Sequence, residues 1–183
     1  MTARKIVVLF VLMVLAATGA FAQATDAHTV TITVAAIGVL QLSSNADIPF
    51  TTVAPANPGN PPGPLAGAPA TDASKSLFYT TANHVGKTRH ITVGSDVNPP
   101  AGTSLTVDST VAGGAGTGAV GVAVSTVTAD LVTAIGSVAT GRIAGTSGAT
   151  LTYKFWVSAP ASLVVGAAPT VVTVTYTMTA DTF

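Results

Sequence analysis

Alternation of apolar and polar residues with a period of two constrains this chain most. Two stretches near its end, "ATLTYKFWVS" (149–158) and "TVVTVTYTMTA" (170–180), place apolar side chains at every second position with mostly threonine between them. Successive side chains of a strand point to opposite faces, so this spacing predicts strands with one buried and one solvated face. The buried face of the last strand is expected to consist of Val172, Val174, Tyr176 and Met178. Strands of this kind favour a β-sandwich, in which two sheets bury their apolar faces against each other.

The same pattern recurs along the chain in short pieces that glycine and proline separate. Further strands are expected at 28–43, 76–82, 87–95, 103–110, 119–127 and 130–135. The pieces 76–82 and 87–95 flank the turn "NHVG" and are expected to form a hairpin. The best helical candidate, 128–139, contains Gly136 and several β-branched residues, which weaken it. The fold expectation is an all-β, antiparallel, immunoglobulin-like sandwich of about seven to nine strands.

The start of the chain is typical of a secretory signal peptide. Arg4 and Lys5 precede an unbroken apolar run, and the small residues of "GAFAQA" predict cleavage before Gln23. The apolar run is too short to cross about 30 Å of hydrocarbon, so no membrane span is expected in the mature chain. We therefore expect residues 1–22 to be removed, and 23–183 to form a single exported domain at the cell surface, in the extracellular space or in the periplasm. Within it, 49–69 holds seven prolines and predicts a loop.

The charge composition excludes several classes of function. Without Arg4 and Lys5 the chain keeps five Lys and Arg residues against seven Asp, and it has no Glu. A net charge of −2 by that count gives no basic surface for nucleic acid, so nucleic acid is not an expected partner. Charged residues make up 8% of the chain, against about 25% in an ordinary domain, which does little to discourage self-association. The absence of Cys excludes disulfides, Cys-ligated zinc and thiol catalysis.

No catalytic or metal-binding motif is present in the sequence. The histidines 28, 84 and 90 lack the spacing that metal sites favour, and the aspartates are scattered singly, mostly in predicted turns. "GTSGA" around Ser147 lacks the G-x-S-x-G spacing of a hydrolase. Asp96 and Asn98 have the spacing of two calcium ligands, but the rest of a calcium loop is missing and turn chemistry explains them. We expect no enzymatic activity, no metal and no cofactor.

The two terminal strands raise the question of self-association. Residues 170–180 contain neither proline nor any charged residue, although natural edge strands are usually guarded by lysine, other charged residues or proline. Residues 28–34 are equally unguarded, with Val30, Ile32 and Val34 on one face and threonines on the other. Either the last strand is central in its sheet, or another chain occupies its edge. A terminal strand can be exchanged between subunits without unfolding the core, whereas the alternative is that the two strands pair within one monomer.

The region 88–180 resembles small exported immunoglobulin-like surface proteins of the fimbrial and coat-subunit type. The resemblance rests on "RHITVGSDVNPPAGTSLTVDST", "TVTADLVTAIGS", "GATLTYKF" and the ending "VTVTYTMTA". It implies a non-enzymatic structural subunit of a bacterial-type surface filament, fimbria or coat, which self-associates, and terminal strand exchange is a possible route of assembly. The alternative is a monomeric secreted binding module, such as an adhesin or carbohydrate-binding domain. An exposed aromatic contact would favour that alternative, and Trp156 is the candidate.

Overall fold

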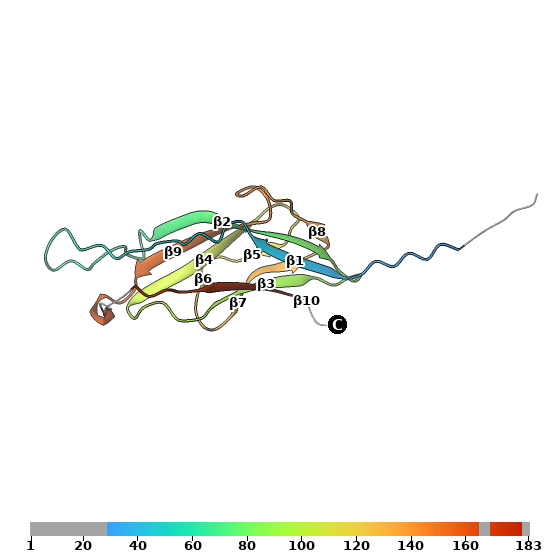
Figure 1. Ribbon diagram of the computed structural model, residues 1–183. Helices are drawn as coiled ribbons and strands as arrows, with labels where there is room; N and C mark the ends of the chain where they lie inside the picture. Colours follow the sequence, from blue (N-terminus) through green and yellow to red (C-terminus); the bar gives the residue numbers. More distant parts are fainter. Residues whose placement is uncertain (1–28, 165–168, 181–183) are drawn as a thin grey trace, which may run out of the picture. The chain divides into compact units, whose positions relative to one another are not determined.

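A computed structural model gives the fold of residues 29–164 and 169–180. The chain divides into two units, residues 1–34 and residues 35–183. The predicted signal peptide, residues 1–22, lies outside the described residues. All ten strands of the described residues belong to the second unit, where they alternate with turns and loops (Figure 1). In the described ranges there is no α-helix, and no helix is long and apolar enough to cross a membrane.

The larger sheet consists of six antiparallel strands within the described residues. Its main order is β1–β2–β9–β4–β6, and β8 pairs with β2 beside β9. The strands are β1 (Ile37–Leu42), β2 (Ala70–Ala82), β4 (Thr103–Val111), β6 (Val122–Ala123), β8 (Val138–Ala139) and β9 (Ala149–Val157). The long pairing of β4 with β9 runs from Thr103 opposite Val157 to Val111 opposite Ala149. The strand predicted at 149–158 is therefore confirmed, and it lies at the centre of the sheet.

The smaller sheet contains four antiparallel strands in the order β10–β3–β7–β5. They are β3 (Arg89–Ser95), β5 (Thr117–Gly118), β7 (Ala129–Ile135) and β10 (Val174–Ala180). The register of β10 against β3 is regular from Val174 opposite Ser95 to Ala180 opposite Arg89. The segment 128–139, the best candidate for a helix, forms β7 and β8 instead, because its β-branched residues suit a buried strand.

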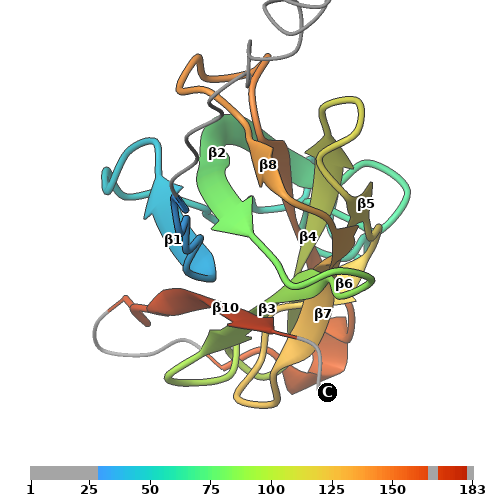
Figure 2. The same cartoon turned by 90° about the vertical axis from the view of Figure 1, so that its right-hand side faces the viewer.

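The two sheets pack face to face around an apolar core (Figure 2). The inner face of β9 shows the predicted alternation, with Leu151, Tyr153 and Phe155 buried between half-buried neighbours. Ile91 and Val132 face them from the smaller sheet and are fully buried. The prediction of an all-β antiparallel sandwich is thus confirmed. The ten strands exceed the expected seven to nine because three of them have two residues each and follow no readable alternation.

Two local expectations are wrong. The pieces at 76–82 and 87–95 do not form a hairpin, because β2 belongs to the larger sheet and β3 to the smaller one. The turn between them crosses from one sheet to the other, and β2 pairs with β1 and β9 instead. The strand expected at 119–127 is reduced to β6, since Gly121 has a positive φ of 69° and bends the chain.

The proline-rich segment 49–69 forms the predicted loop and is fastened to the larger sheet. The ring of Phe50 stacks on Phe155 with centroids 5.5 Å apart. At the other end of the loop, the carbonyl of Pro64 accepts a hydrogen bond of 2.8 Å from the amide of Val157. The segment therefore covers one end of β9 rather than extending as a free linker.

Candidate functional site

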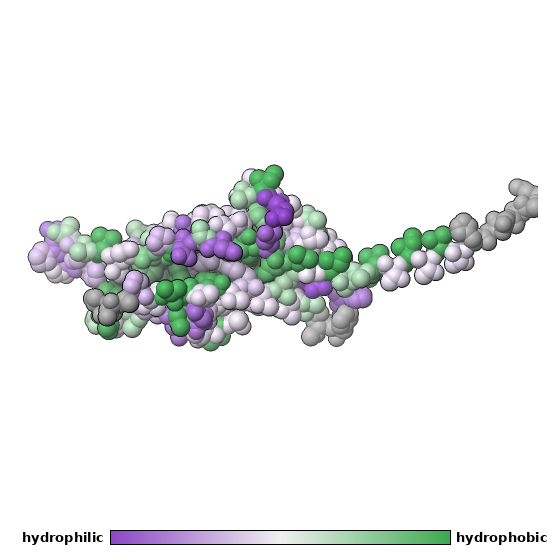
Figure 3. All heavy atoms as spheres, in the orientation of Figure 1, coloured by the Kyte–Doolittle hydropathy of each residue, from purple (hydrophilic) through white to green (hydrophobic). Residues whose placement is uncertain are grey.

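The first described residues, 29–36, form an extended segment without strand pairing. Its apolar side chains are exposed: Val30 is 68% accessible, Ile32 82% and Val34 79%. The strand that was expected to begin at residue 28 begins at Ile37, so the expectation of a half-buried strand at 28–34 is wrong for the single chain. The reason is that the apolar face finds no partner among the described residues. In Figure 3 hydrophobic residues (green) alternate along this segment with residues of intermediate hydropathy (nearly white), as the sequence requires.

The last strand, β10, lies at an edge of the smaller sheet. Of the two possibilities for residues 170–180, a central position is therefore excluded. Val172, Val174, Tyr176 and Met178 pack against the core as predicted, but each stays half-buried. The intervening threonines are exposed. Within the described part of the chain β10 pairs with β3 alone, so an apolar and uncharged edge strand has an open side.

Tyr176 anchors β10 to the opposite sheet through its hydroxyl group. That hydroxyl is hydrogen-bonded to the hydroxyl of Tyr153, which projects from the centre of the larger sheet. Burial raises the pKa of both tyrosines above the ordinary value of 10.0. The contact holds the two sheets together in the region where no described strand pairs with the outer side of β10.

The edge strand of the larger sheet, β1, lies on the same side of the sandwich as β10 (Figure 2). Its sequence, "IGVLQL", also contains no charge, and Ile37 and Val39 are exposed. Leu40 and Leu42 are partly buried against the core. Two unguarded edges thus lie on the same side of the sandwich. We call the edges of β1 and β10 together the open side.

The opposite side of the sandwich is closed by the chain itself. Residues 117–123 cross from the smaller to the larger sheet there, and Ala119 joins the two. Its amide donates to the carbonyl of Leu131 in β7, and its carbonyl accepts from the amide of Ser109 in β4. The edge strands β5 and β6 have two residues each, which is one way in which natural sheets protect an edge. A strand can therefore be added far more readily at the open side.

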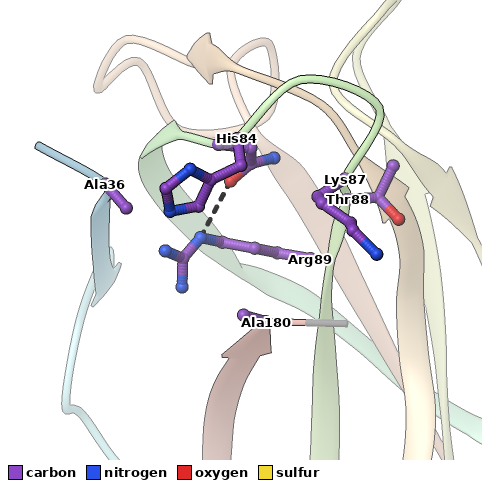
Figure 4. A pocket seen from close by; sticks show the side chains of 7 residues that line it. Ala36, His84, Lys87, Thr88, Arg89 and Ala180 are labelled. Carbon is purple, nitrogen blue, oxygen red and sulfur yellow. Dashed lines mark hydrogen bonds between the residues drawn. The ribbon is translucent and has the colours of Figure 1, made fainter. Parts of the chain in front are cut away.

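A pocket of about 260 Å³ marks one end of the open side (Figure 4). It is lined by residues from the start of β1, the turn between β2 and β3, and the end of β10: Ala36, Asn83, His84, Lys87, Thr88, Arg89 and Ala180. The side chain of Arg89 reaches across it, and its guanidinium donates 2.9 Å to the amide oxygen of Asn83. A Cβ placed on Gly38 would lie 2.8 Å from the Nη1 atom of Arg89, so the guanidinium rests against the backbone of β1. None of these lining residues is acidic.

The sequence interpretation did not identify this basic pocket. The signal was the clustering of basic residue types, since His84, Lys87, Arg89 and His90 fall within seven positions of a chain with few charges. Clustering alone did not show that the β2–β3 turn joins two sheets, and this crossing is what places Arg89 between β1 and β10.

Trp156 is half-buried on the outer face of the larger sheet. It pairs with Ser104 of β4 and precedes Val157, to which the proline-rich loop is bonded. On the same face, Lys154 forms an ion pair with Asp108. Trp156 is thus neither core nor fully exposed, and its role as a contact residue stays a prediction.

The remaining polar residues serve the turns. Asp96 accepts hydrogen bonds of 2.8 Å from the amides of Val97 and Thr173, and these bonds hold its pKa below 3.8. Asn98 accepts 3.0 Å from the amide of Thr126. Both residues fasten loops, as the sequence predicted. No group of three or more His, Asp or Glu residues gathers into a metal site within the described ranges.

Comparison with known proteins gives no match at the level of a family model, a curated relative or a solved structure.

Proposed function

We propose that this protein is a non-enzymatic structural subunit of an exported surface filament, fimbria or coat, and that its copies assemble by exchange of the N-terminal strand. One observation carries the proposal: Val30, Ile32 and Val34 expose an alternating apolar face, and the sandwich has two unguarded edges on one side. The predicted signal peptide, the low charge and the resemblance to fimbrial and coat subunits support it. Val30, Ile32 and Val34 lie on the donor strand, which pairs with another copy. The domain that receives this strand contributes β10, with Val172, Val174, Tyr176 and Met178.

Strand addition explains why such a face persists in a secreted protein. An added strand satisfies the free N–H and C=O groups of an edge, while its alternate side chains enter the space between the sheets. None of the three donor residues belongs to the apolar core, so pairing of the donor with another subunit leaves that core unchanged. Assembly then covers the exposed apolar face of the donor and the unpaired strand edge together. Neither is then available for aggregation.

Deletion of residues 23–35 tests the proposal. The exported wild-type protein is expected to form oligomers, and the truncated protein is expected to fold as a monomer with an open edge. A synthetic peptide of residues 27–36 should bind the truncated protein and raise its melting temperature. The peptide with Ile32→Asp should not bind, because a carboxylate would enter an apolar space. A peptide with Thr33→Ser changes the outer face and serves as the matched control.

Multi-angle light scattering and thermal melting measure these outcomes. Two results together would contradict the proposal: the wild-type protein stays monomeric at high concentration, and the truncated protein neither binds the peptide nor gains stability from it. A monomeric wild-type protein would instead favour the alternative, a secreted binding module. Trp156→Ala would then be tested for loss of ligand binding.

A further inference from the structure

We infer that the outer face of the larger sheet carries a binding site for a neutral glycan, with Trp156 as the platform for a sugar ring. The site lies on β4 and β9, in the interior of the sheet and not on an edge. It is therefore independent of the proposed assembly and goes beyond it. Three features of this face carry the inference: one aromatic ring, polar groups that the fold leaves free, and balanced charge.

Six side chains of β4 and β9 lie in two rows on this face. Directly opposite residues of an antiparallel pair point to the same side of the sheet. The three opposite pairs are Ser104 with Trp156, Thr106 with Lys154, and Asp108 with Thr152. All six residues are half-buried, whereas Val107 and Tyr153, which alternate with them, are buried on the inner side. We call these six residues the outer array.

Trp156 is the largest side chain of the outer array, and the side chains beside it leave room for a ligand. Its opposite residue, Ser104, is small. Lys154, the one long neighbour, forms its ion pair with Asp108, which lies two residue pairs away from Trp156 along the sheet. The lysine side chain is thus directed away from the indole. The indole projects beyond the serine and keeps part of its surface accessible.

The polar groups of the outer array keep capacity for hydrogen bonds to a ligand. Within the described part of the chain, the hydroxyls of Ser104, Thr106 and Thr152 are not engaged in hydrogen bonds to protein groups. Asp108 receives the ammonium group of Lys154 at one oxygen and a hydrogen bond of 2.7 Å from the amide of residue 121 at the other. A lysine has three donors and each carboxylate oxygen has two lone pairs, so both partners of the ion pair can bond further.

This combination of groups fits a sugar. A sugar ring has an apolar surface of C–H groups, which packs on an aromatic ring, and a rim of hydroxyls that both donate and accept hydrogen bonds. The outer array offers one indole, three hydroxyls and a pair of groups of which one donates and the other accepts. The charges of Lys154 and Asp108 cancel, so the array does not favour a phosphate, a sulfate or another charged group.

The length of the outer array favours a chain of sugar rings over a single ring. A strand rises about 3.4 Å per residue, so Thr152 and Trp156 are separated by roughly 13 Å along β9. The proline-rich loop bonds to Val157 beside one end of the array, and residue 121 bonds to Asp108 at the other end. A glycan laid along β4 and β9 would place one ring on the indole and further rings over the ion pair.

The indole itself reports on the site, because Trp156 is the single tryptophan of the chain. Residues 23–183 are titrated with three soluble neutral polysaccharides: hydroxyethyl cellulose, galactomannan and amylopectin. We expect a saturable change in tryptophan emission with at least one of them, and slower migration in a native gel that contains it. Dextran sulfate, the charged comparison, should change neither the emission nor the migration at physiological salt.

Four variants assign the binding to the outer array. Trp156→Ala is expected to weaken binding about tenfold or more, whereas Trp156→Tyr keeps an aromatic ring and should stay within about threefold of the wild type. Thr106→Val removes one hydroxyl at nearly constant shape and should weaken binding about two- to tenfold. Thr177→Ala lies on the outer face of the smaller sheet and is the matched control, with no expected effect. Gel migration measures binding, and thermal melting confirms that each variant is folded.

Three results would overturn the inference: no change in emission or migration with any of the three neutral polysaccharides, binding of dextran sulfate alone, or full binding by a folded Trp156→Ala variant. The test is separate from that of assembly. Ile32→Ser should leave glycan binding unchanged, because Ile32 does not belong to the outer array. Glycan binding by a protein that stays monomeric would therefore refute the proposed function and support the inference, and assembly without glycan binding would do the reverse.

Discussion

Replacement of Ile32 by serine is the sharpest single test of the proposed association through the N-terminal segment. Ile32 is the centre of the exposed apolar face, and because it is 82% accessible its side chain is expected to contribute little to the stability of the monomer. Serine removes the apolar side chain and adds a hydroxyl without adding charge. If the donor strand is buried on assembly, the whole effect of the substitution should fall on association.

The expected magnitude follows from the area that is still exposed. Full burial of an isoleucine side chain contributes about 1.5–3 kcal/mol, and about four fifths of that remains available here. The loss is then roughly 1.2–2.5 kcal/mol for each interface. A loss of this size raises the dissociation constant between copies of the chain about eightfold to seventyfold.

Sedimentation velocity over a dilution series of residues 23–183 measures the dissociation constant, and thermal melting of the dilute monomer measures stability. Thr33→Ser provides the control because it alters the outer face of the same segment. We expect it to change association by less than about threefold, which corresponds to the usual ±0.5 kcal/mol of a surface substitution. The melting temperature of the monomer should be the same for all three proteins.

Two results would refute this reasoning. Equal association constants for the wild type and Ile32→Ser would show that the apolar face is not buried on assembly. A fall of many degrees in the melting temperature of the monomer would show that Ile32 belongs to the core of its own sandwich, in contradiction to its exposure.

Three further predictions concern the sandwich itself. Gly118→Ala would push a methyl group against the carbonyl of Ser109 and should lower the free energy of unfolding by about 1–3 kcal/mol, whereas Gly136→Ala meets nothing within 4 Å and should be near neutral in urea titrations. The pKa of Asp96 is lower in the folded protein than in the unfolded chain, so its stabilising effect is present above pH 3.8 and is lost as the pH falls through the folded pKa. Asp96→Asn should therefore flatten the dependence of stability on acid pH. A pH profile identical to that of the wild type would contradict this expectation. All three tyrosines have raised pKa values, that of Tyr79 about 12, so ultraviolet titration of the native protein should show no ionisation step at pH 10. Since the unfolded chain ionises near 10, the associated stability is complete below pH 10 and is lost at higher pH, and a tyrosine step at pH 10 in folded protein would refute the burial.

Several features of the fold could be predicted from the sequence because they depend on neighbours along the chain. The alternation in 149–158 marked Leu151, Tyr153 and Phe155 as the buried set, and the structure buries these three. The same reasoning placed Val174, Tyr176 and Met178 on the inner face of the last strand. Side-chain direction in a strand is set by the backbone, so period-two alternation reveals it without knowledge of the partner.

The pairing of strands was not accessible in the same way. β2 and β3 follow each other across a short turn, which favours a hairpin, yet they belong to different sheets. A strand with one apolar face is satisfied by any partner that covers that face, so local sequence does not distinguish a hairpin from a crossing between sheets. The basic pocket at Arg89 was missed for this reason, because that crossing is what brings Arg89 against Gly38 of β1.

The sequence by itself determined that residues 28–34 and 170–180 carry unguarded apolar stripes, because charge and spacing are local properties. The tertiary structure decided what each stripe does in the single chain. It gave 174–180 a neighbour in β3 on one side, and it left Val30, Ile32 and Val34 exposed. Burial requires a surface that the rest of the chain must supply, and the two sheets of this sandwich are completed by other strands.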